Sequence, residues 1–125
     1  MKLKTFLIIA TVMPTIFGLS LLLVPDMLMT TNGLVVSESA KVFARGVAGL
    51  LLGLAIINWY ARKDLASPII RGVLIGNIVV HALGLITDGL AVQNNVITQN
   101  PWFGLFVHAF FVVGFGYYLM KPQKS

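Results

Sequence analysis

Four long apolar stretches, separated by short polar segments, dominate the order of residues along this chain. They cover about residues 3–24, 42–60, 68–90 and 102–120. At about 1.5 Å of rise per residue, each stretch is long enough as a helix to cross a bilayer core of about 30 Å. The pattern predicts an all-α, polytopic membrane protein. Its four transmembrane helices are expected to form one antiparallel bundle, a single membrane domain over residues 1–125.

Local signals mark the ends of these helices. Pro25 stops the first helix, because proline cannot continue the backbone hydrogen-bond ladder. Ser37 or Ser39 can cap the second helix, and Ser67-Pro68 combines an N-cap residue with a favourable first helical residue. The segment between the first two helices carries turn-forming residues and is predicted to be irregular.

Composition supports the membrane class and excludes several functions. The chain is 58% hydrophobic and 10% charged, with a mean hydropathy of +0.91. A soluble domain carries roughly a quarter charged residues, so the expected surroundings are the lipid bilayer. The net charge of +5 comes with no basic stripe of stacking aromatics, so no nucleic-acid partner is expected. The absence of cysteine excludes disulfides and thiolate metal sites.

The distribution of basic residues predicts the orientation. With the N-terminus inside, seven of the nine basic residues are cytoplasmic: Lys2, Lys4, Arg62, Lys63, Arg71, Lys121 and Lys124. Only Lys41 and Arg45 lie on the far side. The positive-inside rule therefore predicts that both termini are cytoplasmic, in a cell membrane that we expect to be a bacterial inner membrane.

Polar residues inside the predicted spans are the candidate site. Asn77, His81 and Asp88 share one face of the third predicted helix, at spacings of four and seven residues. His81 lies about 10 Å below Asp88, and His108 on the fourth helix lies about 9 Å below Trp102. The two histidines are therefore at similar depth in the outer half. Because polar groups within a span rarely face lipid, these four residues are expected inside the bundle and are the candidate ligand-binding set.

An ion pair between Arg45 and Asp88 is a separate prediction. Arg45 precedes Arg62 by 17 residues (62 minus 45), and Asp88 follows Arg71 by 17 residues (88 minus 71). If Arg62 and Arg71 share the inner interface, Arg45 and Asp88 reach the same level about 25 Å away. Such a pair would join the second and third helices near the outer surface.

Several interpretations of these polar groups stay open. They can serve packing alone, through the Arg45–Asp88 pair and hydrogen bonds of the histidines to each other or to carbonyls. They can bind the head of a quinone, sterol or isoprenoid at Asn77, His81 and His108. A b-type haem with His81 and His108 as axial ligands is a further alternative. So is a proton or ion path through Asp88, His81 and Asn77. No catalytic motif or metal-ligand signature occurs, so no catalytic residues, metal or cofactor are expected.

Short motifs also resemble a known group of proteins. Arg45-Gly46, Leu52-Gly53-Leu54, Trp59 before Arg62, and Ser67-Pro68 before Arg71 are similar to small bacterial four-helix membrane proteins of unknown function. More distantly, the chain looks like DoxX-type proteins and the fungal ergosterol-scaffold family. The resemblance implies an accessory or scaffold role beside lipid or quinone chemistry, and it supplies no catalytic residue.

Two functions are therefore expected from the sequence. The first is a small membrane accessory or scaffold subunit without catalytic chemistry of its own, bound to other membrane subunits or to copies of itself. The alternative is a binder of a lipophilic small molecule in the outer half of the bundle, near His81 and His108.

Overall fold

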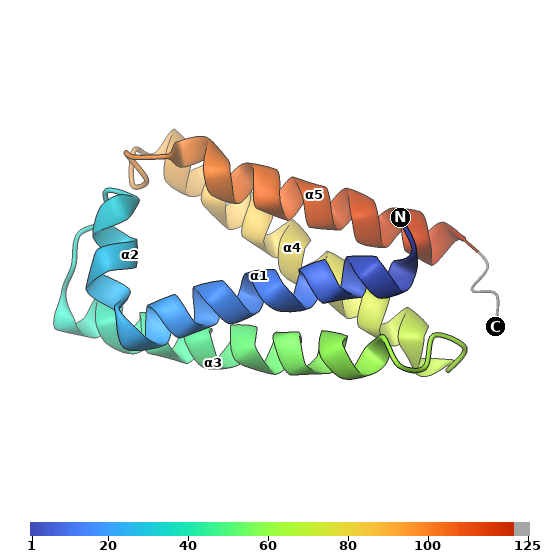
Figure 1. Ribbon diagram of the computed structural model, residues 1–125. Coiled ribbons are helices and arrows are strands. Elements are labelled where there is room, and N and C mark those ends of the chain that lie inside the picture. Colours follow the sequence, from blue (N-terminus) through green and yellow to red (C-terminus); the bar gives the residue numbers. More distant parts are fainter. Residues whose placement is uncertain (122–125) are drawn as a thin grey trace.

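The computed structural model describes residues 1–121, and this part of the chain is all-α with five helices (Figure 1). They are α1 (Leu3–Leu23), α2 (Pro25–Thr31), α3 (Glu38–Ala61), α4 (Ile69–Gln93) and α5 (Pro101–Met120). The four long helices, α1, α3, α4 and α5, have the length and composition to cross a membrane. Helix length and hydropathy thus confirm the prediction of a multi-pass membrane protein with four spanning helices.

Two helices extend three or four residues beyond a predicted end. α3 begins at Glu38 rather than at 42, because Ser37 caps it: the backbone N–H of Ala40 donates to Ser37 Oγ at 3.1 Å. α4 continues to Gln93 rather than to 90, and Asn95 then adopts the left-handed conformation (φ 55°) that ends the helical path.

The segment between the first two spans also differs from its prediction. Pro25 ends α1 but is also the first residue of a seven-residue helix, α2, where an irregular segment was predicted. The fixed φ of proline suits the first turn of a helix, and Asp26 follows it with a charge that favours a helix N-terminus. The same proline therefore both stops one helix and starts the next.

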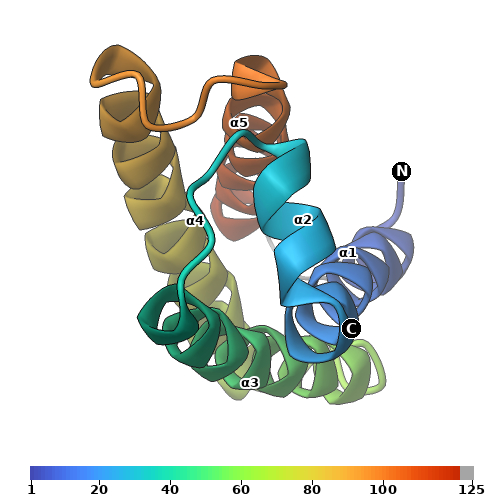
Figure 2. The ribbon, with the colours of Figure 1, turned by 90° about the vertical axis from the view of Figure 1, so that its left-hand side faces the viewer.

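The long helices are arranged as two pairs. α1 lies along α3, and α4 lies along α5 (Figure 1). Gly18 allows the close approach in the first pair, since a Cβ there would lie 2.9 Å from Leu52 Cγ. The pairs meet where α3 turns into α4 and diverge toward α2, so that α3 and α4 are well apart at that end (Figure 2).

Where the two pairs meet, an aromatic core holds them together. The ring of Phe6 in α1 lies 4.8 Å from that of Phe115 and 5.8 Å from that of Phe111, both in α5. The hydroxyl of Tyr118 donates to the carbonyl of Met1 at 2.6 Å. The start of α1 and the last turn of α5 therefore lie at the same end of the bundle, which we call the terminal end.

A second connection joins the two pairs at the opposite end, the α2 end. The backbone N–H of Gln99 donates to the carbonyl of Asn32 at 3.3 Å, and Asn100 Nδ2 donates to the carbonyl of Thr31 at 3.2 Å. Gly33 has a φ of 73°, and Thr98 leaves no room for a side chain on it. These contacts between the end of α2 and the 94–100 loop form the α2 clasp.

Basic residues gather at the terminal end, and several lie over aromatic rings. The guanidinium of Arg62 lies 3.4 Å from the centre of the Trp59 ring, and Lys63 lies 4.8 Å from the centre of the Tyr60 ring. Six of the seven basic residues predicted to be cytoplasmic belong to helix ends at this end (Lys2, Lys4, Arg62, Lys63, Arg71 and Lys121). The seventh, Lys124, lies outside the described residues.

Candidate functional site

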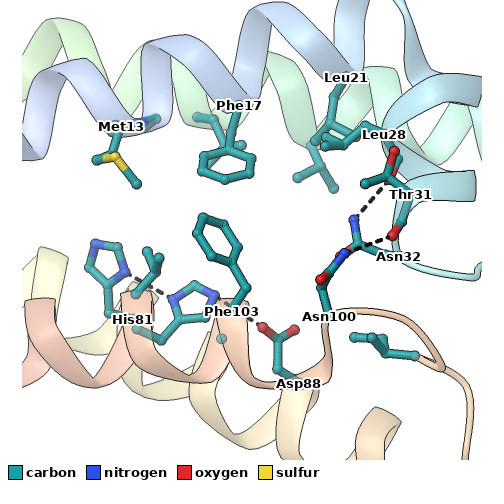
Figure 3. A pocket seen from close by; sticks show the side chains of 18 of the residues that line it. Met13, Phe17, Leu21, Leu28, Thr31, Asn32, His81, Asp88, Asn100 and Phe103 are labelled. Atoms are coloured by element: carbon teal, nitrogen blue, oxygen red, sulfur yellow. Dashed lines mark hydrogen bonds and ion pairs between the residues drawn. The ribbon is translucent and has the colours of Figure 1, made fainter.

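A cavity of about 690 Å³ occupies the space between the two helix pairs at the α2 end. Its walls come from all five helices and the α2 clasp, and most of the residues are aliphatic or aromatic. From α1 and α2 these include Met13, Phe17, Leu21, Leu28 and Met29; from α3, Val47 and Leu51; and from α4 and α5, Val80, Phe103, Val107 and Phe111. In Figure 3 the apolar side chains of α1 and α2 face the polar side chains of α4 and α5 across this space.

The polar wall of the cavity is a row of three side chains. His81 Nδ1 in α4 and His108 Nδ1 in α5 are 3.0 Å apart, so they share a hydrogen bond. The other nitrogen of His108, Nε2, lies 3.7 Å from Asp88 Oδ2. The sequence left open whether the histidines bond each other or backbone carbonyls, and in the structure they bond each other. Asp88 extends the row (Figure 3).

Glycines hold this row in place. The ring of His108 lies directly against Gly84 of α4, where any Cβ would collide with it. In the same way, the carboxylate of Asp88 lies against Gly104 of α5, again with no room for a Cβ. Each polar side chain therefore rests on a glycine of the opposite helix, so α4 and α5 can approach closely enough for the contacts to form.

Packing fixes the orientation of His81. Its ring stacks on Phe111, with ring centres 4.5 Å apart and an interplanar angle of 18°. The side chain is 8% exposed. Its second nitrogen, Nε2, has no hydrogen-bond partner among the described residues. This atom is not fully enclosed by protein, so another molecule can reach it. His81 therefore presents one unpaired polar atom to the cavity.

Asn77, the fourth predicted ligand residue, does not line the cavity. It lies nearer the terminal end, where its amide pairs reciprocally with that of Asn58 in α3, at 2.8 and 3.0 Å. Asn58 Nδ2 also donates to the carbonyl of Ala10 at 3.0 Å. Pro14, four residues on, has no N–H to bond that carbonyl. The structure thus assigns Asn77 to a network that joins three helices, and no hydrogen bond links it to His81 in the predicted proton path.

The predicted Arg45–Asp88 ion pair is not formed. Asp88 lies beside His108, and the basic residue paired with acids near the start of α3 is Lys41, with Asp26 and Glu38. The prediction placed Arg45 and Asp88 at one level but assumed that α3 and α4 stay in contact along their length. Because these helices diverge, a shared level does not bring the two side chains together.

The spacing of the histidines also bears on the haem alternative. A metal held between two imidazole nitrogens at about 2.0–2.1 Å each would need them about 4 Å apart. The facing Nδ1 atoms are 3.0 Å apart and already share a hydrogen bond. As arranged here, the facing Nδ1 atoms of His81 and His108 do not fit as axial ligands of one iron. Among the described residues, no three metal-ligating side chains gather into a site.

Two features of the site were not anticipated from the sequence. Asn58 was not singled out, although it lies four residues before Arg62 and so near the depth of Asn77, six residues after Arg71. The wall from α2 was also missed, since that segment was predicted to be irregular. Counting residues from the basic anchors, in the way that depth was counted for the two histidines, would have placed Asn58 and Asn77 at similar depth and indicated their contact.

Comparison with models of protein families, with curated proteins and with solved structures finds no match for this chain. No family is therefore identified, and the resemblance carried by its motifs stays an expectation. Functional conclusions come from the residues of the cavity themselves.

Proposed function

We propose that this protein binds a lipophilic small molecule with a polar head, such as a quinone, sterol or isoprenoid, in the cavity at the α2 end. The observation that carries the proposal is the cavity of about 690 Å³, which is mostly apolar and has the row formed by His81, His108 and Asp88 along one wall. Small-molecule sites are typically clefts of about 300–1,000 Å³, mostly apolar, with a few polar groups that fix orientation. An apolar body would fill the α1 and α2 side while the head meets the polar row.

The route into the cavity supports a ligand taken from the bilayer. The α2 clasp covers one end of the space, and the aromatic core fills the other. Val47 of α3 and Val80 of α4 both line the cavity and are 46% and 43% exposed. Because α3 and α4 diverge at this level, we propose that the ligand passes between them from the lipid.

A cavity-filling substitution tests the proposal. Leu51→Trp places a bulky side chain in the cavity, whereas Leu50→Trp, one residue away and 75% exposed, is the matched control. Both variants and the parent protein would be purified in lipid nanodiscs, and retained small molecules identified by mass spectrometry. We expect a retained lipophile in the parent and in Leu50→Trp, and its loss in Leu51→Trp. Equal retention by all three, or none by the parent, would contradict the proposal.

We further propose that the terminal end faces the cytoplasm, in a bacterial inner membrane, so that the cavity lies in the outer half of the bilayer. The support is the concentration of basic residues at the terminal end. Because the chain has no cysteine, single cysteines at Ser67 and Val96 report each side. A membrane-impermeant maleimide added to intact cells should label V96C and leave S67C unlabelled until the cells are opened. The reverse labelling pattern would invert the topology.

An accessory or scaffold role is the second candidate. A Cβ on Gly46, Gly49 or Gly53 of α3 would meet nothing within 4 Å, so no helix of the described part of the chain packs closely on this small-residue face. Such faces let transmembrane helices approach closely. Gentle extraction and native mass measurement test the role, and a stable lone monomer would count against it.

A further inference from the structure

We propose that the cavity prefers a ligand whose polar head is a hydroxyl group, donating a hydrogen bond to His81 Nε2, over one whose head is a carbonyl. The inference rests on the proposed function and narrows its ligand class to lipophilic alcohols and phenols. It follows from the direction of the hydrogen bonds along the row from Asp88 through His108 to His81.

The carboxylate of Asp88 sets that direction. Asp88 lies five residues before the end of α4 at Gln93 (93 minus 88), about 8 Å from the helix end, and its side chain is 28% exposed. At this level an ionised carboxylate can be hydrated, and an ionised carboxylate only accepts hydrogen bonds. Its ion-pair partner among the described residues is His108, whose Nε2 lies 3.7 Å from Asp88 Oδ2. That nitrogen is therefore expected to carry a proton, because an unprotonated one would turn a lone pair toward the negative charge.

The protonation of His108 then determines that of His81. In a neutral imidazole one nitrogen carries the proton and the other accepts. With its proton on Nε2, His108 accepts at Nδ1, so the 3.0 Å bond requires His81 to donate from its own Nδ1. His81 is then left with an unprotonated Nε2. The row ends at an acceptor, and the group that completes it must be a donor.

The other polar side chains that line the cavity already donate to backbone carbonyls at the α2 end. Asn32 Nδ2 donates to the carbonyl of Leu28 at 2.8 Å, and Thr31 Oγ1 donates to that of Met27 at 2.7 Å. The Asn100 amide is engaged in the α2 clasp. Among the nitrogens of the two histidines, the acceptor left without a partner is therefore His81 Nε2.

The His81 ring is also held rigidly enough to discriminate. Stacking on Phe111 at 4.5 Å and a near-parallel arrangement with Phe115 (16°) fix the plane of the ring. A half-turn of the ring within that plane would break the 3.0 Å bond between the two Nδ1 atoms, so this bond determines which nitrogen faces the ligand. A carbonyl head placed here would put its oxygen against a lone pair, with no hydrogen bond to compensate. A site that leaves a polar group unpaired with one ligand and paired with another discriminates between them.

Farnesol and farnesal are suitable probes, because they share one isoprenoid chain and differ in an alcohol or aldehyde head. Binding would be measured for the protein in nanodiscs, by displacement of the retained lipophile in native mass spectrometry. We expect farnesol to bind on the order of tenfold more tightly than farnesal, the worth of one hydrogen bond. In His81→Phe, which keeps an aromatic ring against Phe111, farnesol should fall to the level of farnesal, while farnesal stays unchanged.

Two further variants separate the direction of the row from the presence of His81. His108→Phe frees His81 to carry its proton on Nε2, so farnesal should gain affinity and the preference should disappear. Thr87→Val is the control: the Thr87 hydroxyl bonds only the backbone of its own helix, and this variant should behave as the parent. Equal binding of both probes by the parent overturns the hydroxyl preference and leaves the proposed function standing. If neither probe binds or displaces anything, both proposals are overturned.

Discussion

Replacing Asn58 by leucine should destabilise the protein by more than the loss of the Asn58 hydrogen bonds alone, because a buried backbone carbonyl also loses its partner. Leucine is close to asparagine in size, so the change removes polar groups without opening a large cavity. Three hydrogen bonds disappear: two with the amide of Asn77 and one with the carbonyl of Ala10. At about 0.6 kcal/mol for an average hydrogen bond between membrane helices, they sum to about 2 kcal/mol.

The backbone adds a further cost that depends on Pro14. Proline supplies no N–H to the carbonyl of Ala10, so Asn58 Nδ2 is its partner, and without Asn58 the carbonyl is stranded at membrane depth. An unsatisfied buried group costs about 1–3 kcal/mol. The total loss for Asn58→Leu is therefore expected to be about 3–5 kcal/mol. Pro14→Ala restores an N–H for that carbonyl, so it should recover about 1 kcal/mol or more of the cost.

The measurement is the free energy of unfolding in mixed micelles with increasing sodium dodecyl sulfate, followed by tryptophan fluorescence. Asn58→Leu and Pro14→Ala would be compared alone and together in a double-mutant cycle, with Thr87→Val as the lipid-facing control. The reasoning is refuted if the free energy of unfolding of Asn58→Leu differs from that of the parent by less than about 0.5 kcal/mol. It is also refuted if the cost of Asn58→Leu is the same with and without Pro14.

Two further predictions concern glycines on which side chains rest. Gly84→Ala should push the His108 ring out of the polar row and weaken ligand retention, measured by native mass spectrometry, on the order of tenfold. Gly114→Ala should displace the ring of Phe6, which any Cβ at this position would meet, and lower the unfolding free energy by about 1–3 kcal/mol. Gly89→Ala is the control for both, since its Cβ would make only an ordinary 4.0 Å contact. Similar effects of all three changes would show that any added methyl group disturbs these helices.

The spanning helices were the most predictable part of the fold. The hydrophobicity and length of a segment can be evaluated without knowing which other segments it contacts. Ser37 and Pro25 also acted as their local chemistry predicts. The same local reasoning missed α2: Pro25 was interpreted as a stop, although proline also favours the first turn of a helix. How the helices pair depends on many weak contacts between segments and has no comparable signal in one sequence.

The candidate site shows where counting along a helix succeeds and where it fails. Depth in the bilayer follows from residue number, so the contact between His81 and His108 was predictable. Lateral position does not follow from residue number. Arg45 and Asp88, which counting placed at one level, therefore do not meet, and Asp88 lies beside His108 instead. Asn77 similarly faces the bundle as predicted, but toward Asn58 rather than toward a ligand.

The α2 clasp covers one end of the cavity and the aromatic core fills the other, and for the proposed ligand this determines which concentration governs binding. A molecule that reaches the cavity between α3 and α4 comes from the bilayer, where lipophiles accumulate far above their concentration in water. Occupancy then depends on the mole fraction of the ligand among the membrane lipids. A site of modest intrinsic affinity can be filled under these conditions, and an apparent affinity measured in detergent would change with the amount of detergent present.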